Sequence, residues 1–261
     1  MYASNFFENK MLSLMTGSSI TAPSGMYLAL FISNPSDTGS AGTECSYDGY
    51  ARRQITFSTP AASGSGMAMQ NTADITFPEC TGGSQTVTYI GVFDSASVGS
   101  GNMYLYAQLT SSLIVQNGVS PVFRAGDLKW TWTGIFSTYY KTAIMNTLRG
   151  TNLGNFSPYI ALCNGDPTGA GNEFSGNNYS RMAVTMTTPA QQSSGVCQTQ
   201  NSAQIISAIS SGAWGNLTHI AFYDAATNGN AFAVISVGGT YNIGANASVG
   251  FRAGELKLSV N

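Results

Sequence analysis

The stretch Phe123-Arg124-Ala125-Gly126-Asp127-Leu128-Lys129-Trp130 recurs near the end of the chain as Phe251-Arg252-Ala253-Gly254-Glu255-Leu256-Lys257-Leu258. After its glycine, each copy alternates apolar and polar side chains, so that Leu128, Trp130 and Trp132 fall on one face in the first. This period of two is typical of a half-buried strand. The glycine can adopt the positive φ of a tight turn before that strand. Each copy is therefore predicted to be the closing strand of a repeated unit.

The repeat divides the 261 residues into two modules, 1–133 and 134–261. Outward from the closing strand, apolar runs at matched positions predict further strands because turn-forming residues bound each run. The first matched pair, residues 26–31 and 158–163, is apolar throughout, which suits a strand buried on both faces. Shorter strands are predicted further on, at residues 103–109, 113–116, 231–237 and 241–243. The pattern predicts a mainly β fold with one β-sandwich of jelly-roll type in each module.

Each module is predicted to begin with a short amphipathic helix. Residues 4–16 carry apolar side chains at helical spacing, Asn5 and Glu8 form a predicted capping box, and Gly17 ends the helix. Residues 137–148 repeat the apolar stripe before a second glycine. Two interpretations of these stripes remain open. Each packs beside the sheet, or each docks on a neighbouring subunit.

Charge is scarce in this chain. Only 8% of residues are Asp, Glu, Lys or Arg, whereas about 25% is usual, and the net charge is −2. Nucleic-acid binding depends on clustered Lys and Arg, so it is not expected. The N-terminus does not resemble a targeting segment, and no apolar run reaches the roughly 18 residues of a membrane span. We expect synthesis in a cytosol and no membrane partner.

The four cysteines, Cys45, Cys80, Cys163 and Cys197, are nearly equally spaced within each module, which would allow two disulfides. The repeat argues against this pairing, because no cysteine aligns with a cysteine of the other module. Free, partly buried thiols are therefore predicted. Zinc binding is less favoured still, since the chain lacks a Cys-x-x-Cys pair.

Six charged positions recur in both modules, which is unexpected in a chain with so few charges. We interpret them as structural anchors, with Glu44 pairing with Arg52 and with Arg124 binding loop carbonyls or Asp94. The alternative is a sugar or ion site built from Asp94 or Glu44 with an adjacent tyrosine. The pairs are Glu44/Glu173, Arg52/Arg181, Asp94/Asp224, Arg124/Arg252, Asp127/Glu255 and Lys129/Lys257.

Catalytic patterns are weak in this sequence. The single histidine, His219, aligns with Tyr89, and the chain has no nucleophile-elbow serine for which it could act as general base. No phosphate-binding glycine loop is present. A carboxylate pair for glycoside hydrolysis and a calcium site in loop 166–173 stay open, although the loop lacks EF-hand spacing. No enzymatic activity and no cofactor are expected.

The order of the motifs resembles a family of bacteriophage structural modules, labelled tail fibre or minor virion proteins. The resemblance rests chiefly on Gly49-Tyr50-Ala51-Arg52 and Tyr89-Ile90-Gly91-Val92-Phe93-Asp94. In the second half, Asn178-Tyr179-Ser180-Arg181 and Ile220-Ala221-Phe222-Tyr223-Asp224 stand in their place. The resemblance covers both halves. It implies a virion protein assembled in the host cytoplasm, either fibre-associated in the tail or decorating the capsid.

Function is then predicted to depend on protein–protein assembly, with other virion proteins and further copies of the chain as partners. Aromatic residues near the module junction are candidate interface residues, namely Trp130, Trp132, Tyr139 and Tyr140. Equally, they could fill the cores and the seam between them. The alternative function is a carbohydrate-binding module for a bacterial surface glycan, with Tyr50, Tyr179 or Trp214 as the stacking ring.

Overall fold

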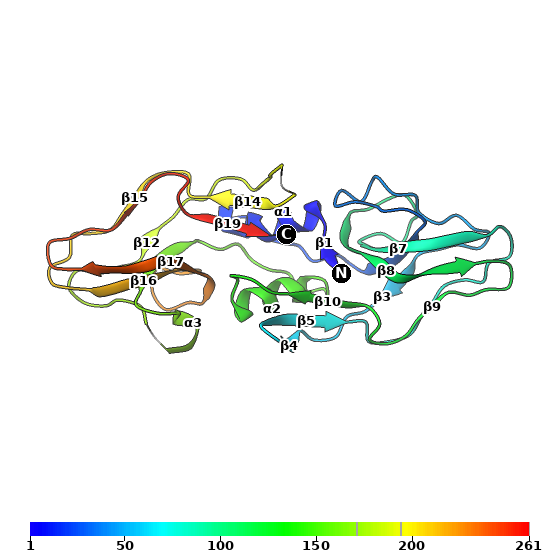
Figure 1. Ribbon diagram of the computed structural model, residues 1–261, viewed down its shortest axis with the longest axis horizontal. Helices are drawn as coiled ribbons and strands as arrows, with labels where there is room; N and C mark the ends of the chain where they lie inside the picture. Colours follow the sequence, from blue (N-terminus) through cyan, green and yellow to red (C-terminus); the bar gives the residue numbers. More distant parts are fainter. Residues whose placement is uncertain (171, 194, 261) are drawn as a thin grey trace.

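The computed structural model describes residues 1–170, 172–193 and 195–260, and it confirms a mainly β chain with a short helix at the start of each half (Figure 1). The first half contains β1 (Tyr2–Ala3), α1 (Asn5–Ser13) with a 3₁₀ turn (Leu14–Thr16), β2 (Met26–Phe31), β3 (Arg53–Ile55), β4 (Ala61–Ser63), β5 (Gly66–Gln70), β6 (Ile75–Thr76), β7 (Gln85–Phe93), β8 (Met103–Val115), β9 (Val122–Phe123) and β10 (Lys129–Trp132). The second contains α2 (Thr138–Thr147), β11 (Tyr159–Cys163), α3 (Pro167–Ala170), β12 (Met182–Ala183), β13 (Ala190–Gln191), β14 (Cys197–Gln200), β15 (Ile205–Ile206), β16 (Gly215–Tyr223), β17 (Ala231–Ile243), β18 (Gly250–Phe251) and β19 (Lys257–Val260).

A larger antiparallel sheet dominates each half. Its strand order is β1-β8-β7-β2-β3 in the first half and β12-β11-β16-β17 in the second. The central pairing is repeated, with Leu30 opposite Ile90 in one half and the corresponding leucine opposite Ile220 in the other. Leu30 faces the main core, whereas its neighbour Phe31 is buried on the opposite face. The strand predicted to be buried on both faces is confirmed.

One strand of each larger sheet, β8 in the first half and β17 in the second, is longer than the sequence predicts. Residues 103–115 and 231–243 each form one continuous strand, where two shorter strands were expected. The pairing of β7 with β8 shifts register between Val87 and Tyr89, and that of β16 with β17 shifts between Leu217 and His219. These irregularities absorb extra residues in β8 and β17, so pairing resumes beyond them.

The closing strands, β10 and β19, lie in smaller sheets with the orders β10-β5-β4 and β13-β14-β19. The turn before each has the predicted glycine at positive φ, 89° at Gly126 and 79° at Gly254. The alternating pattern is also confirmed, because Trp130 and Trp132 are buried while Lys129 is exposed. Asn261, on the polar face of the second predicted strand, lies outside the described residues.

The two helices are exchanged between the halves. Helix α1 contacts β13, β14 and β19 of the second half as well as its own β8, and α2 contacts β5 of the first half as well as its own β17. Figure 1 shows α1 beside β14 and β19, and α2 beside β5 and β10. The two chain segments that follow the helices meet where Ile20 pairs with Leu153. The predicted stripes therefore dock on the other half of the same chain, and one continuous core spans both halves.

The helix caps differ from the predicted capping box. Ser4 caps α1 by accepting a hydrogen bond from the Phe7 amide, and Ser137 does the same for α2. Asn5 is instead the first helical residue. Glu8 does not bond to the start of its own helix, because it is buried against the second half and accepts a hydrogen bond from Gln191 Nε2 at 3.1 Å.

All four cysteines are free and buried. Burial raises the pKa of the Cys45 and Cys163 thiols to about 12, so they remain protonated and unreactive. In the described part of the chain, no helix has the length and apolar character needed to cross a membrane.

Candidate functional site

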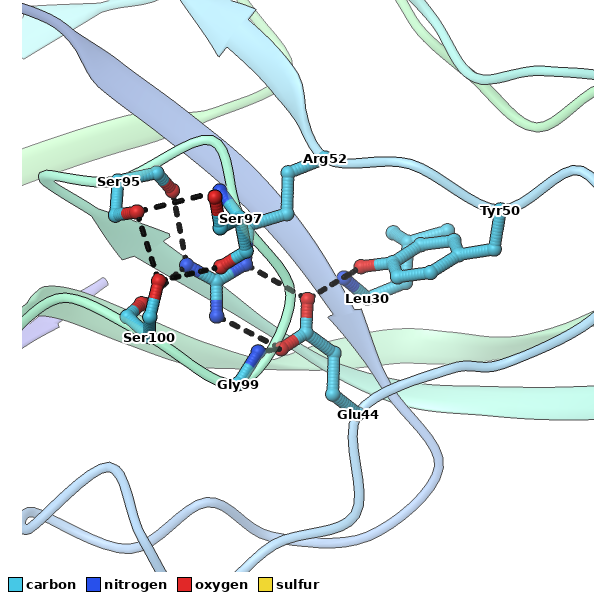
Figure 2. Close-up of polar contacts among 8 residues, drawn as sticks. All are labelled: Leu30, Glu44, Tyr50, Arg52, Ser95, Ser97, Gly99 and Ser100. Carbon is cyan, nitrogen blue, oxygen red and sulfur yellow. Dashed lines mark hydrogen bonds and ion pairs between the residues drawn. The ribbon is translucent and has the colours of Figure 1, made fainter.

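The most developed polar cluster of the first half joins Glu44 and Arg52, the pair predicted from the repeat. Glu44 follows a long loop and pairs with Phe31 at the end of β2, and Arg52 directly precedes β3. Their charged groups form two parallel contacts, Nε to Oε1 at 2.7 Å and Nη2 to Oε2 at 2.8 Å (Figure 2). This bidentate arrangement fixes both side chains in one geometry.

The same guanidinium also holds the loop between β7 and β8. Nη1 of Arg52 donates to the carbonyl oxygens of Ser95 at 2.9 Å and Ser100 at 2.8 Å (Figure 2). Its plane lies 4.0 Å from the centre of the Phe93 ring, and the side chain is only 1% exposed. Because its three nitrogens are hydrogen-bonded and one face packs on Phe93, Arg52 ties the loop to the sheet.

Tyr50 completes the cluster. Its hydroxyl donates to Glu44 Oε1 at 2.9 Å and accepts from the Leu30 amide at 3.0 Å. Burial and the adjacent Glu44 carboxylate raise the pKa of Tyr50, so the hydroxyl remains a protonated donor. The Gly99 amide donates to the second oxygen of the same carboxylate at 3.3 Å.

The second half repeats the Glu–Tyr–Arg contacts of the cluster. Arg181 binds Glu173 through Nε at 2.9 Å and Nη2 at 2.7 Å, and its Nη1 donates to the carbonyls of Ala225 and Asn228. The guanidinium lies 3.5 Å from the centre of the Tyr223 ring. Tyr179 bridges Glu173 and the Leu162 amide, as Tyr50 does in the first half.

Asp94 and Asp224 close the same loops. Asp94 Oδ1 accepts from the Asn102 amide at 2.7 Å, and Asp224 Oδ1 accepts from the Asn230 amide at 2.7 Å. Both carboxylates also accept from the side-chain amide of their asparagine. Their role in the structure is to shape a turn.

The prediction that Arg124 binds Asp94 or loop carbonyls is wrong. Arg124 pairs with Asp74 at 2.7 Å on the surface instead. Arg252 lacks the corresponding carboxylate, because Gln204 stands where the first half has Asp74. Three of the remaining predicted anchors each make one side-chain contact. Asp127 accepts from the Arg124 amide, Glu255 accepts from the Arg252 amide, and Lys129 donates to the Ser63 hydroxyl. Lys257 is exposed.

Two anchors were missed in the sequence. Asn71 is 1% exposed, and its side chain accepts from the Gly126 and Leu128 amides while donating to the carbonyls of Ala73 and Arg124. Asn201 is equally buried and makes the corresponding contacts in the second half, apart from that to the glycine amide. The repetition of Asn-Thr/Ser-Ala in both halves was the available signal.

The candidate interface aromatics lie mostly inside the chain. Trp130, Trp132 and Tyr140 are buried, and Trp132 packs 5.5 Å from Phe136 and 5.9 Å from Tyr140, measured between ring centres. Only Tyr139 is substantially exposed, at 39%. The interpretation of the other three as contacts between subunits is therefore wrong, and they fill the intramolecular seam.

The proposed sugar-stacking rings are also packed within the fold. Trp214 is 8% exposed and donates from Nε1 to the Asn177 carbonyl at 3.0 Å. Tyr50 and Tyr179 have their hydroxyls engaged on both sides. Trp214 therefore offers no open stacking surface, and Tyr50 and Tyr179 are partly buried against the core.

Metal ligation is not evident where it was considered. No group of three or more potential ligand residues occurs among residues 1–170, 172–193 and 195–260. In the loop weighed for calcium, Asp166 Oδ1 accepts from both the amide and the hydroxyl of Thr168. Gly171 of that loop lies outside the described residues.

The geometry of the clusters is that of two corresponding loop anchors, one in each half. A family model described as Podophage GP4 fiber I protein gp80 matches residues 2–131 and matches again at residues 135–259. The chain belongs to this family. The resemblance seen in the motifs is thereby confirmed, and each match of the fibre family contains one complete Glu–Tyr–Arg cluster. No curated protein matches this fibre protein.

Proposed function

We propose that this fibre protein is a rigid structural segment of the phage particle that acts through protein–protein contacts and catalyses no reaction. The family supports a role in the fibre. The clusters support a structural use of the charges, because each guanidinium and carboxylate of the Glu–Arg pairs is engaged by other groups of the fold. A catalytic carboxylate needs access to a substrate.

Rigidity follows from the exchanged helices. We infer that modules 1–133 and 134–261 form one mechanical unit, since each supplies the helix that packs on the smaller sheet of the other. The hydroxyl of Tyr140 in α2 donates a hydrogen bond to the Met11 carbonyl of α1, deep in the seam. Bending between the halves would break this core, and a segment of a fibre benefits from that resistance.

The observation that carries the assembly proposal is that strands reaching the two ends of the elongated molecule carry exposed apolar side chains. Figure 1 shows β7, β8 and β9 extending to one end and β15, β16 and β17 extending to the other. Ile114 in β8 is 60% exposed, and Ile206 in β15 and Tyr241 in β17 are 59% and 57% exposed. We infer that these apolar side chains are covered in the assembly, because the buried core of a protein interface is apolar and poor in charge.

Light scattering of the purified chain, together with its co-sedimentation with purified particles, tests the proposal. Ile206→Ser combined with Tyr241→Ser should reduce self-association or particle binding, and Ile114→Ser should do so at the other end. Val98→Ser is the matched control, because Val98 is 50% exposed but lies in the loop that Arg52 anchors. A wild-type monomer with no affinity for particles, or end variants that behave like the control, would contradict the proposal.

A further inference from the structure

A polar hollow in the second half is not explained by the anchors or by assembly. It has a volume of about 600 Å³ and lies at the N-terminus of α2, against β16, β17 and the start of α3. This size falls within the range of small-ligand pockets. Its walls include the polar side chains of Tyr139, Lys141, Asp166, His219 and Asn230.

The first half places an acidic residue of its own beside the corresponding helix N-terminus. The Asp37 carbonyl accepts from the Asn5 amide, the first of α1, at 3.0 Å, and the Asp37 carboxylate accepts from the Tyr106 hydroxyl. In the second half, Gly169 replaces Asp37 and Val234 replaces Tyr106. The internal carboxylate and the tyrosine that holds it are therefore both missing from this hollow.

The helix end of the hollow is electropositive. The first-turn amides of Thr138 and Tyr139 make no hydrogen bond within the described residues, and α2 has no acidic residue in its first turn. Unpaired amides at a helix N-terminus favour an anion. In the first half the corresponding turn is closed by the carbonyl of its own loop.

Lys141 strengthens this preference. It occupies the position that is Glu8 in the first half, it is 4% exposed, and its Nζ donates to the Gly134 carbonyl at 3.0 Å. No carboxylate pairs with it among the described residues. Burial lowers the pKa of Lys141, as expected for an ammonium group without a counterion. An anion in the hollow would supply that counterion.

The remaining walls suit hydroxyl groups and a sugar ring. Asp166 keeps Oδ2 free while Oδ1 holds Thr168, and His219 uses Nδ1 toward Thr218 and leaves Nε2 available. Tyr139 presents a ring that is 39% exposed and fixed through its hydroxyl to Asp224 at 3.2 Å. Carboxylate, imidazole and amide groups beside an exposed aromatic ring match the donors, acceptors and apolar face of a pyranose.

We propose that this hollow binds an acidic saccharide of the uronic acid type, with the sugar carboxylate at Lys141 and the first turn of α2. The hydroxyl groups then face Asp166, His219 and Asn230. The sugar carboxylate then accepts from the first-turn amides of α2, as the Asp37 carbonyl accepts from the Asn5 amide of α1. This site is separate from the rings of Tyr50, Tyr179 and Trp214, and it does not depend on the assembly surfaces at the ends of the molecule.

His219 provides a direct probe, because it is the only histidine in the chain and gives a single set of imidazole NMR signals. Sodium glucuronate should shift these signals saturably at constant pH. Methyl glucoside, which lacks the carboxylate, and glutarate, which lacks the ring, should each bind at least about tenfold more weakly, the effect of losing one charged hydrogen bond or the ring contacts. A glutamate-rich peptide should not compete.

Two variants locate the site. Lys141→Met should weaken glucuronate binding by about tenfold or more, and Val234→Tyr, which restores the residue of the first half, should block it by occupying the hollow. Glu79→Gln, an exposed and distant change, should bind as the wild type does. No saturable shift with glucuronate, equal binding of glutarate or the peptide, or unchanged binding by a folded Val234→Tyr variant would each overturn the proposal.

Discussion

Replacing Glu8 with glutamine should stabilise the fibre protein near neutral pH, because Glu8 is a buried acid in the seam. The side chain is 2% exposed, and burial, only partly offset by the Gln191 hydrogen bond, raises its pKa from 4.5 to about 7. The folded chain therefore binds this proton more tightly than the unfolded chain. Stability is retained below pH 4.5 and is lost as pH rises toward 7, by about 3 kcal/mol from this group alone.

Glutamine removes this penalty and keeps the hydrogen bonds. Its carbonyl can still accept from Gln191 Nε2, and its amide can donate to Gln191 Oε1, which is buried without a partner among the described residues. The free energy of unfolding of Glu8→Gln, minus that of the wild type, should grow by about 3 kcal/mol between pH 4 and pH 8.

Urea unfolding followed by tryptophan fluorescence at several pH values measures this difference. The exposed Glu79→Gln variant serves as the control and should track the wild type at every pH. Equal pH dependence of Glu8→Gln and the wild type would refute the reasoning, because it would show that Glu8 ionises in the folded chain as easily as in the unfolded one.

Three further predictions concern the anchors and the seam. Arg52→Met should lower the free energy of unfolding by about 3–5 kcal/mol, since it leaves a nearly buried carboxylate unpaired, whereas Arg124→Met on the exposed pair should cost less than about 1 kcal/mol; equal losses in urea unfolding would contradict the ranking. Asn71→Ala should cost about 3 kcal/mol by leaving buried amides and carbonyls without partners, and faster amide hydrogen exchange at Gly126 and Leu128 would reveal the site. Trp132→Ala should lower stability by about 3–5 kcal/mol and loosen the coupling of the halves, whereas an unchanged thermal transition would place the seam elsewhere.

Local patterns predicted much of the fold. Alternation identified β10 and β19, and a continuous apolar run identified β2 as a strand buried on both faces. The Glu44–Arg52 pair was also predictable, because the acid, tyrosine and arginine recur together in both halves. Repetition was informative there because every member of the cluster is repeated.

Features that depend on non-local packing could not be predicted. An apolar stripe shows that α1 is covered on one side, but it does not distinguish the sheet of one half from the similar sheet of the other. Asp74, the partner of Arg124, is not repeated and so gave no signal. Asn71 is repeated as Asn201, yet a neutral side chain does not by itself indicate burial or an anchoring role.

The central claim is that the chain is a rigid segment of a phage fibre whose ends contact neighbouring protein. A cryo-electron microscopy map of the particle's fibre tests it most directly. We expect density that fits both halves in one fixed orientation. Neighbouring chains should cover Ile114 at one end and Ile206 and Tyr241 at the other. Fibre density without this chain, or a chain attached only through its middle with both ends in solvent, would contradict it.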